Sequence, residues 1–531
     1  MGRSDEQHRG LTRKELLESA AAVVPALWLA RYGDAGVQPA SASSGGAEGS
    51  LAGMNVILFL TDQERAIQHF PPGWAYNNLP GLTRLKRHGL TFQRAFTNAC
   101  MCSPARSTLM TGYFPAQHGV KYTLEEDMPA DQYPQVELPL DLANMASVMS
   151  AAGYNPVYKG KWHMNKPAGD TWAPSDVGQY GFARWDPPDA GANQDISEAG
   201  GGSTDNDGRF MDSVGDVADG TEGALQYLNS YAAQQQPFFM VISLVNPHDV
   251  LMYPKNYLNA GYDDSWLEGD IRLPRTVNED LSTKPDVQLE FLRLFNLSGP
   301  LPTPQMKRNY LNFYGNLMKS SDNYLVEVLD TLTATGLLEN TLIVRTSDHG
   351  EMGLAHGGLR QKNFNFYEES LRVPLIYSNP TLYPRPCGTR DLVSHVDLLP
   401  TLATLFGAPS SARADWEGVD YAPLVVRGGK APQDYVVFTY DDYQSGQAQG
   451  PYPKPPNHIV SIRERRWKLA KYYDADGNVP NQWDMYDLAR DPLETTNLAQ
   501  RGYERTAEQE RHYRRLRRQL AQVQKTRLQP L

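Results

Sequence analysis

The chain has few cysteines and fewer basic than acidic side chains. It holds 3 cysteines in 531 residues, too few for a framework of disulfide bonds. Its 61 aspartates and glutamates outnumber its 50 lysines and arginines, which gives a formal net charge of −11. Because proteins that bind nucleic acids generally need a basic surface, this composition argues against general binding to nucleic acids.

Long hydrophobic segments are also absent after the N-terminal region. No apolar run reaches the roughly 18 residues that a membrane-spanning helix needs, so we expect no stable membrane insertion. The length allows two or more domains, and contents of 40% hydrophobic and 21% charged residues are typical of a globular protein. Any specific function must therefore be sought in local motifs.

The N-terminal segment has features of an export signal. Arg13 and Lys14 precede an apolar run over residues 20–30, and Ala40-Ser41-Ala42 fits a cleavage site. The basic pair resembles a degenerate twin-arginine signal, a route that carries folded proteins. We therefore expect a periplasmic or secreted protein. The alternative is a disordered or helical extension on a cytoplasmic protein.

Residues 98–112 hold the motif on which the functional prediction depends. Within them, Cys102-Ser103-Pro104-Ala105-Arg106 has the form Cys-x-Pro-x-Arg. Pro104 restricts the backbone around it, and Arg106 carries a permanent charge whose donors suit an oxyanion or can hold the loop that carries Cys102. The residues after Arg106 can begin a helix. Cys102 is therefore expected near a helix N-terminus, where anionic groups are favoured.

Other interpretations of the cysteines stay open at this point. The five-residue string can arise by chance, and a lone cysteine is most often a small buried hydrophobic residue. Cys100 and Cys102 also form a Cys-x-Cys pair, a spacing that suits metal binding or redox chemistry. Companion motifs elsewhere in the chain are needed to choose among these interpretations.

The Cys-x-Pro-x-Arg motif resembles the signature of the type I sulfatases. In that family an enzyme oxidises the cysteine to the aldehyde formylglycine, so the resemblance implies a nucleophile made from Cys102 and a formylglycine-generating enzyme as partner. A hydrated aldehyde carries two hydroxyls on one carbon. One attacks sulfur, and the other then loses its proton, so that the aldehyde re-forms and sulfate leaves without a second attack by water. Companion motifs follow in the family's order over roughly residues 54–500.

Two apolar runs of strand length end in candidate metal ligands. Residues 55–60 precede Asp62, and residues 341–346 precede Asp348. Continuous apolar runs suit parallel strands that are buried on both faces, and open α/β sheets place ligands at the carboxyl ends of such strands. Taken alone, Asp62 would be interpreted as a turn residue or a helix cap.

The resemblance implies that these strand ends bind one divalent metal ion. The pairs Asp62-Gln63 and Asp348-His349 are similar to those of choline-sulfatase-like enzymes and phosphonate monoester hydrolases, whereas many sulfatases have Asp-Asp and Asp-Asn. The expected ligands are Asp62, Gln63, Asp348, His349 and an oxygen of modified Cys102. Mixed oxygen and imidazole ligands fit Mn²⁺ or Ca²⁺, and the metal would lower the pKa of the attacking hydroxyl and hold the sulfate.

Two further segments supply side chains for sulfate binding and proton transfer. Gly160-Lys161-Trp162-His163 is close to a Gly-Lys-Trp-His motif of the family. In an extended segment Lys161 and His163 lie on the same side, so that Lys161 would contact a sulfate oxygen and His163 would bond the formylglycine hydroxyl or take its proton. His248 follows a strand predicted over residues 238–244 and is the candidate general acid. A buried histidine bonded to the backbone is the alternative there.

Later family-like segments add one more functional residue. Lys362 precedes an Arg-Val-Pro sequence and is expected to bind the sulfate and to stabilise the leaving oxygen together with His248. We expect Arg106, Lys161 and Lys362 to bind the substrate anion. For His356, in the same loop, a role in the site and a position on the surface are equal alternatives. The residues that we interpret as structural are His118, Arg372, His395 and Asp397.

The order of predicted elements, together with the resemblance, indicates an α/β protein with an alkaline-phosphatase-like fold. Its mostly parallel central sheet would be flanked by helices. We expect an export signal and linker over residues 1–50, a catalytic domain over 51–425 and a smaller α+β subdomain over 426–531. That subdomain would contain a short antiparallel sheet and a basic terminal helix. The segments 165–225 and 251–305 are predicted to be irregular and to shape the substrate pocket.

These observations predict a sulfuric ester hydrolase that acts on a sulfated small molecule or glycan. Because phosphorus can replace sulfur in such a site, hydrolysis of phosphate or phosphonate monoesters is the alternative activity. A third interpretation is an unmodified chain that only binds sulfated glycans.

Overall fold

The computed structural model describes residues 48–531, apart from residues 68, 126–134, 193–194, 214, 216–219 and 448–449. The predicted export signal, with Arg13, Lys14 and residues 20–30 and 40–42, lies outside the described residues. Among the helices of the described part, none combines the length and the apolar character that crossing a membrane requires.

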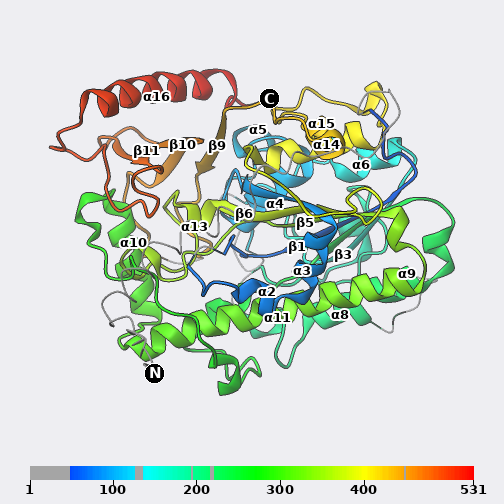
Figure 1. Cartoon of the computed structure of the whole chain (residues 1–531). Helices are drawn as coiled ribbons and strands as arrows, with labels where there is room; N and C mark the ends of the chain where they lie inside the picture. Colours follow the sequence, from blue (N-terminus) through cyan, green and yellow to red (C-terminus); the bar gives the residue numbers. More distant parts are fainter. Residues whose placement is uncertain are drawn as a thin grey trace, which may run out of the picture. The chain divides into compact units, whose positions relative to one another are not determined.

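A mostly parallel sheet forms the centre of the protein (Figure 1). Its strands are β1 (Asn55–Thr61), β2 (Gly89–Phe96), β3 (Asn155–Gly160), β4 (Phe238–Ser243), β5 (Thr341–Ser347), β6 (Arg372–Ser378), β7 (Cys387–Thr389) and β8 (Val393–Ser394). Their order is β3-β4-β1-β5-β6-β2-β7, and β8 pairs with β2. β3, β4, β1 and β5 are parallel neighbours, whereas β6 runs antiparallel to both β5 and β2. The predicted fold class is confirmed.

The helices of the described part are mostly short. They are α2 (Trp74–Asn78), α3 (Pro80–Arg87), α4 (Cys102–Thr111), α5 (Pro115–His118), α6 (Met145–Ala151), α7 (Pro174–Gly178), α8 (Asn206–Asp212), α9 (Ala224–Asn229), α10 (Asp286–Ser298), α11 (Pro304–Ala334), α12 (Ala355–Gly358), α13 (Glu368–Leu371), α14 (Leu398–Leu405), α15 (Ala422–Arg427) and α16 (Ala507–Thr526). Short 3-10 turns include η3 (His248–Met252) and η7 (His395–Asp397).

Alternate residues of β1 face two different hydrophobic cores. Leu58 and Leu60 belong to one cluster of buried side chains, and Ile57 and Phe59 to another. Successive side chains of a strand point to opposite faces, so a strand covered on both sides needs apolar residues at every position. This explains why the sequence of β1 is an unbroken apolar run.

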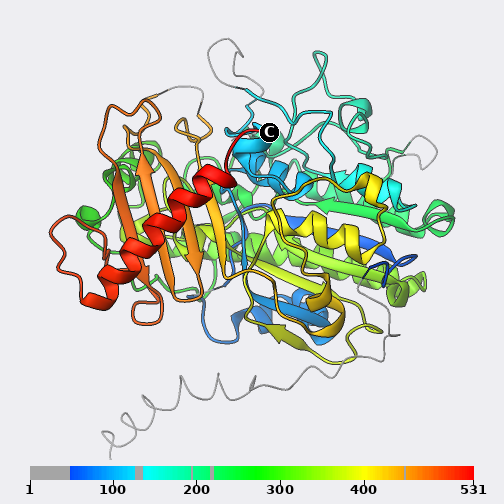
Figure 2. The ribbon, with the colours of Figure 1, turned by 90° about the horizontal axis from the view of Figure 1, so that it is seen from above.

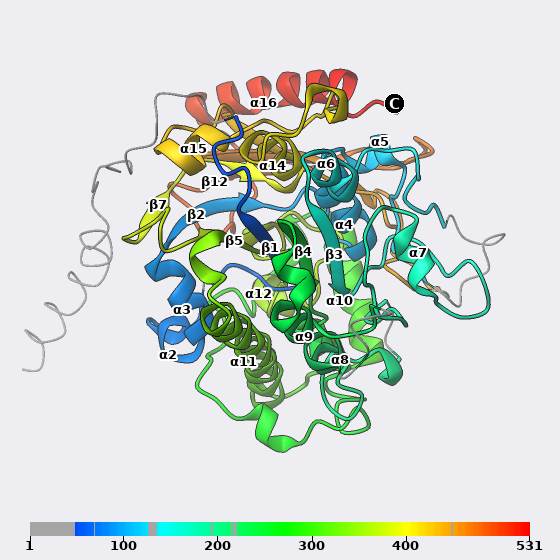
Figure 3. The same cartoon turned by 90° about the vertical axis from the view of Figure 1, so that its right-hand side faces the viewer.

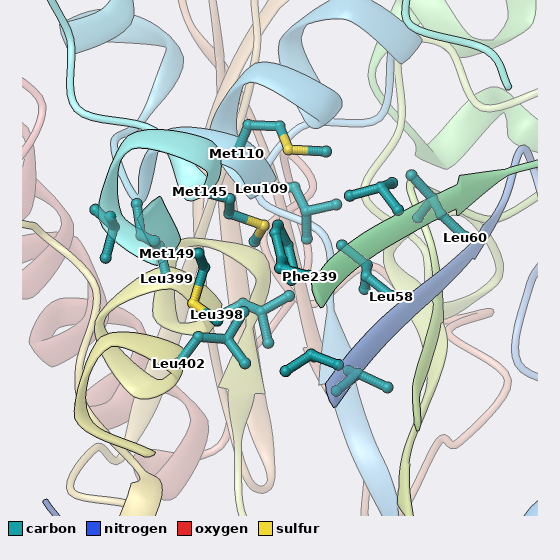
Figure 4. Packing of buried hydrophobic residues seen from close by; sticks show 14 of the residues in the cluster. Leu58, Leu60, Leu109, Met110, Met145, Met149, Phe239, Leu398, Leu399 and Leu402 are labelled. Carbon is teal, nitrogen blue, oxygen red and sulfur yellow. The ribbon is translucent and has the colours of Figure 1, made fainter. Parts of the chain in front are cut away.

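Helices cover both faces of the central sheet. α4, α6 and α14 pack on the face of Leu58 and Leu60, and Figure 4 shows their leucines and methionines gathered there. α3, α9 and the long α11 contribute to the core on the opposite face, which is the lower side of the sheet in Figure 1 and is also visible in Figure 3. Both faces of the sheet are therefore covered by helices, and a ligand site is expected at the ends of the strands.

A second, antiparallel sheet follows toward the C-terminus. It has the order β12-β11-β10-β9, with β9 (Tyr435–Tyr440), β10 (His458–Glu464), β11 (Trp467–Tyr473) and β12 (Gln482–Asp487). α16 lies across this sheet in Figure 2 and packs Leu516 and Leu520 on it. The other face shares a core with residues around Cys100, next to the motif that contains Cys102. The predicted boundary between residues 425 and 426 stays a prediction.

Several predicted segments differ in detail from the structure. The segment 251–305 is not wholly irregular, because it contains α10, and α7 and α8 lie within the segment 165–225. α6 begins at Met145, since the Asn144 side chain accepts hydrogen bonds from the backbone of residues 146 and 147 and caps it. Local polar side chains decide such boundaries.

Candidate active site

The candidate site lies at the carboxyl ends of the four parallel strands. β1 leads into Asp62, β3 into Lys161, β4 into the loop of His248, and β5 into Asp348. The N–H of Lys161 donates to the carbonyl of Ser243 at 2.9 Å, which continues the pairing of β3 and β4 past the strand ends. Segments far apart in sequence therefore meet at the edge where open α/β sheets bind ligands.

Cys102 is the first residue of α4, as predicted for a helix N-terminus, and lies among these strand ends. It is 2% exposed, and its Sγ is 3.3 Å from Nε2 of His349 and 3.7 Å from Oδ1 of Asp62. Burial raises the pKa of the thiol, but the charges of Lys161, Lys362 and His349 outweigh burial and hold the pKa well below its usual value. The site thus stabilises an anion at the position of the predicted nucleophile.

Cys100 has a different environment. Its thiol donates to the backbone carbonyl of Lys362 at 3.0 Å, and burial raises its pKa. Cys102 belongs to a group of close metal-ligand atoms that does not include Cys100. The Cys-x-Cys spacing therefore does not form a joint metal or redox site among the described residues.

Arg106 connects the acidic side chains of the site to its backbone. Nε donates to Asp348 and Nη2 to Asp62, both at 3.1 Å. Nη1 donates to the carbonyl of Lys161 at 2.9 Å and to Oγ of Ser243 at 2.8 Å. These four contacts hold the scaffold of the site, because a planar guanidinium can bind several acceptors at fixed angles. Binding of the substrate anion by Arg106 stays a prediction.

The predicted metal ligands are close together. Ligand atoms of Asp62, Cys102, Asp348 and His349 lie within 4.8 Å of one another, and all four residues are buried. Burial and the neighbouring Asp62 raise the pKa of Asp348 to about 6, so the two carboxylates repel each other. A divalent cation would relieve this repulsion, and carboxylate and imidazole donors fit Ca²⁺ or Mn²⁺.

Gln63 reaches the same site through its side-chain amide. Its Oε1 accepts a hydrogen bond from Nζ of Lys362 at 2.6 Å, and its Nε2 donates to Oε2 of Glu351 at 2.7 Å. Its backbone N–H donates to Oδ1 of Asp348 at 3.0 Å. The amide oxygen of Gln63 thus faces Lys362, whose charge also acts on Cys102.

The two predicted sulfate-binding lysines are both buried beside the nucleophile. Nζ of Lys161 is 2.5 Å from Oδ2 of Asp62 and donates to the carbonyl of Gly191. Burial lowers the pKa of Lys161, but Asp62 and Cys102 outweigh burial and raise it above its usual value. Lys161 is therefore a permanent cation in the site, and Nζ of Lys362 donates to Oε1 of Gln63.

The predicted extended conformation of the Lys161–His163 segment is wrong. His163 has a left-handed φ of 56°, because Asp189 accepts the backbone N–H groups of both Trp162 and His163 and turns the chain. Nε2 of His163 lies 2.6 Å from the carbonyl of Leu124. The ring nevertheless contributes to the low pKa of Cys102, so the residue acts on the nucleophile from a turn and not by alternation along a strand.

His248 lies in η3 and also reaches Cys102. Burial and the charge of Lys161 lower its pKa, while Asp62 and a hydrogen bond with Cys102 act in the opposite direction. The net direction is downward, so His248 is neutral in the free site at pH 7.

The other histidines singled out in the sequence lie away from the group around Cys102 or support it. His118 bonds Oγ1 of Thr108 at 3.0 Å and links α5 to α4. Of the two alternatives for His356, the surface position is wrong: the side chain is 1% exposed and stacks on Tyr367. Its Nδ1 is 2.8 Å from Glu279 and its Nε2 is 3.6 Å from Glu369.

Several residues of the site have no obvious sequence pattern. Ser243, at the end of β4, holds Arg106, and Asp189 turns the His163 segment. Glu351 holds the amide of Gln63 across 288 positions of sequence. Only Glu351 had a local indication, since it follows Asp348-His349 by two residues.

Comparison with known proteins agrees with this geometry. A model of the family described as sulfatase matches residues 54–408, more than half of the chain. The chain belongs to the sulfatase family. A second model, for the C-terminal part of N-sulphoglucosamine sulphohydrolase, matches residues 356–526. The predictions of a sulfatase and of a sulfuric ester hydrolase are confirmed.

Characterised sulfatases align with most of the chain. A choline-sulfatase of Rhizobium meliloti (strain 1021) is 28% identical over 464 residues, which cover 84% of this sulfatase and 82% of the relative. A Delta 4,5-hexuronate-2-O-sulfatase of Bacteroides thetaiotaomicron is 26% identical and covers 80% and 81%. Human arylsulfatase A is 24% identical and covers 84% and 83%.

Solved structures share the fold. A 2-O GAG sulfatase has a TM-score of 0.66 at 21% identity, covering 89% of this sulfatase and 92% of that chain. A phosphonate monoester hydrolase from Silicibacter pomeroyi has a TM-score of 0.62 at 22% identity, covering 89% and 96%. At these identities the likeness concerns the fold alone.

Proposed function

We propose that this sulfatase cleaves sulfate monoesters with a formylglycine made from Cys102 and one divalent metal ion. The position of Cys102 carries the proposal. Its sulfur stands where the hydroxyl of a hydrated formylglycine would be, between His349 and Asp62 and among the charges of Lys161 and Lys362. A formylglycine-generating enzyme would oxidise the cysteine before activity is seen.

Lys161 and Lys362 would bind the oxygens of the sulfate group. Both are buried cations next to residue 102, and burial strengthens their attraction for an anion because little water screens it. Arg106 is already bonded to Asp62 and Asp348 and would keep these acids in place. The substrate anion would thus bind to the two lysines while Arg106 keeps Asp62 and Asp348 in place.

His163 would accept a proton from the hydroxyl of residue 102. A backbone carbonyl only accepts hydrogen bonds, so the 2.6 Å contact with Leu124 assigns the proton of the neutral ring to Nε2. Nδ1 is then the basic nitrogen, and in the described part of the chain no other hydrogen-bonding partner competes for it. The ring is therefore oriented for general-base chemistry.

His248 would donate a proton to the leaving oxygen. It is neutral in the free site, because burial and Lys161 lower its pKa. A bound sulfate ester brings negative charge beside the ring and favours its protonated form. Lys362 would share the stabilisation of the leaving oxygen.

Asp62, Gln63, Asp348 and His349 would hold the metal ion, Ca²⁺ or Mn²⁺. When bound, the ion supplies a positive charge that lowers the pKa of the attacking hydroxyl and polarises the sulfate. The repulsion between the two buried carboxylates supports this assignment, since a cation held by both would relieve it.

The proposal is tested first on the peptide that contains residue 102. Protein made with a formylglycine-generating enzyme should carry the aldehyde by mass spectrometry and should hydrolyse an aryl sulfate, and Cys102→Ala should do neither. Aldehyde without turnover of any sulfate ester, after metal loading, would contradict the proposed activity. If the peptide carries only the unmodified thiol, the result would favour a protein that binds sulfated glycans without cleaving them.

Hydrolysis of phosphate or phosphonate monoesters is the second candidate activity. It is favoured by the pairs Asp62-Gln63 and Asp348-His349, which resemble those of phosphonate monoester hydrolases. Matched aryl sulfate, phosphate and phosphonate esters separate the activities by kcat/KM. The proposed substrate class remains a sulfated small molecule or glycan, because the relatives named above act on substrates of both kinds by their names.

A further inference from the structure

The side-chain amide of Gln63 is fixed in one of its two orientations. Nζ of Lys362 lies 2.6 Å from Oε1, and Oε2 of Glu351 lies 2.7 Å from Nε2. An ammonium group only donates hydrogen bonds, and an ionised carboxylate only accepts them. Both contacts therefore assign the amide oxygen to the side of Lys362 and the amide nitrogen to the side of Glu351.

The carboxylate of Glu351 is itself fixed by three donors. Its Oε1 accepts the hydroxyl of Tyr310 at 2.7 Å and the backbone N–H groups of Gly353 at 3.1 Å and Gln361 at 3.0 Å. Glu351 is fully buried, so water cannot replace these bonds. Backbone N–H groups can only donate, hence the atom at this position must be an oxygen. The second oxygen is left for Gln63.

We propose that Glu351 is a positioning residue of the metal site, which presents the oxygen of Gln63, and not its nitrogen, to the cation. This inference rests on the proposed metal site. An amide oxygen is a good ligand for a hard cation, whereas the amide nitrogen has no free lone pair and carries two positively polarised hydrogens. A reversed amide would therefore remove one ligand and add a repulsive group.

The chemistry of a single substitution exposes this role. In Glu351→Gln the side chain keeps its shape, and its one oxygen must stay with Tyr310 and the two N–H groups. Its new NH₂ group then faces the NH₂ group of Gln63. The conflict at residue 351 is removed only when the Gln63 amide reverses. Its nitrogen then faces Lys362, another donor, and would face the cation.

The reverse pair should repair the site. In the double variant Gln63→Glu/Glu351→Gln, the NH₂ group at 351 donates to one oxygen of the carboxylate at 63. The other oxygen takes the place of the amide oxygen of the natural protein, beside Lys362, where it would serve as a ligand of the cation. Exchanging the two side-chain types thus keeps the hydrogen bond and the ligand.

The experiment measures binding of Ca²⁺ and Mn²⁺ by calorimetry to formylglycine-bearing protein that has been stripped with a chelator. We expect Glu351→Gln to weaken the Kd by roughly 10–100-fold, the usual effect of losing a group that orients a ligand. The double variant should return to within about threefold of the natural protein. Glu222→Gln, a second buried glutamate that binds Arg184 and is not part of the site, should leave the Kd unchanged.

Two results would overturn the inference. One is a Glu351→Gln protein that binds metal as tightly as the natural protein. The other is a double variant that binds no better than Glu351→Gln alone, since a general loss of structure would not be repaired by a second change. Failure of the proposed metal site is distinguishable, because it would appear as absent binding in the unaltered protein.

Discussion

The carboxylate of Asp189 accepts the backbone N–H of His163 at 2.7 Å. Its other oxygen accepts the N–H of Trp162 at 2.8 Å, so one side chain turns the segment that follows β3. The left-handed backbone of His163 follows from this turn, and it brings the ring between Leu124 and Cys102. The conformation of the proposed base thus depends on a residue 26 positions away.

Asp189→Asn should disturb this turn. The asparagine has one acceptor where two N–H groups need acceptors, and a buried donor without a partner costs about 1–3 kcal/mol. We expect urea unfolding to show a loss of this size and kcat to fall by about tenfold or more. Asp330→Asn, in an exposed ion pair with Arg84, is the control and should change neither quantity appreciably. Equal stability and kcat in Asp189→Asn would contradict the role of the turn.

Arg106→Lys tests whether the guanidinium holds the acids of the site. A lysine cannot reach Asp62, Asp348, Lys161 and Ser243 together, so two buried carboxylates lose part of their counter-charge. We expect a loss of stability of about 3–5 kcal/mol and a drop in kcat/KM of about a hundredfold or more. Added Ca²⁺ should restore part of the stability, because it replaces the missing positive charge. Lack of any effect of the metal on the variant would speak against a shared function of Arg106 and the cation.

His356 should make the stability of the protein depend on pH. Burial lowers its pKa, but hydrogen bonds and the charges of Glu279 and Glu369 outweigh burial and raise the pKa to about 9. A raised pKa means that the protonated ring stabilises the folded state fully below the ordinary value of 6.5, and that this contribution is lost as the pH rises through 9.

The measurement for His356 is the free energy of unfolding of the natural protein and of His356→Gln at pH 6 and pH 10. Their difference should shrink by about 3 kcal/mol, which is the shift from 6.5 to about 9 expressed as free energy. His512→Gln, near the surface on α16, is the control for loss of a histidine. A difference that stays constant over this range would show that His356 is not protonated between the two glutamates.

Removal of the metal should lower the melting temperature. Without the cation, the buried carboxylates of Asp62 and Asp348 repel each other. Readdition of Ca²⁺ or Mn²⁺ at about a hundred times its Kd should stabilise the protein by about 2.7 kcal/mol. Asp348→Asn should lose most of this gain in a thermal unfolding scan. An identical gain in the variant would place the bound cation elsewhere.

The sequence by itself determined the strands that carry the candidate site and predicted its principal residues. Apolar runs of strand length, followed by Asp62 and Asp348, predict buried parallel strands with ligands at their ends, because both faces of such strands must be covered. The segment with Cys102 predicts both the helix N-terminus and the family, since the helix start and the motif both consist of residues that are adjacent in the sequence.

The tertiary structure alone decided how these residues are oriented. Gln63 and Glu351 are 288 positions apart, and the alternation rule misplaced His163 because it could not include the hydrogen bonds from Asp189. The sequence left a surface position open for His356 because its acidic partner Glu279 lies 77 positions earlier in the chain. Local patterns record which faces are buried, whereas the partner of a buried polar group depends on which distant segments the order of strands brings together.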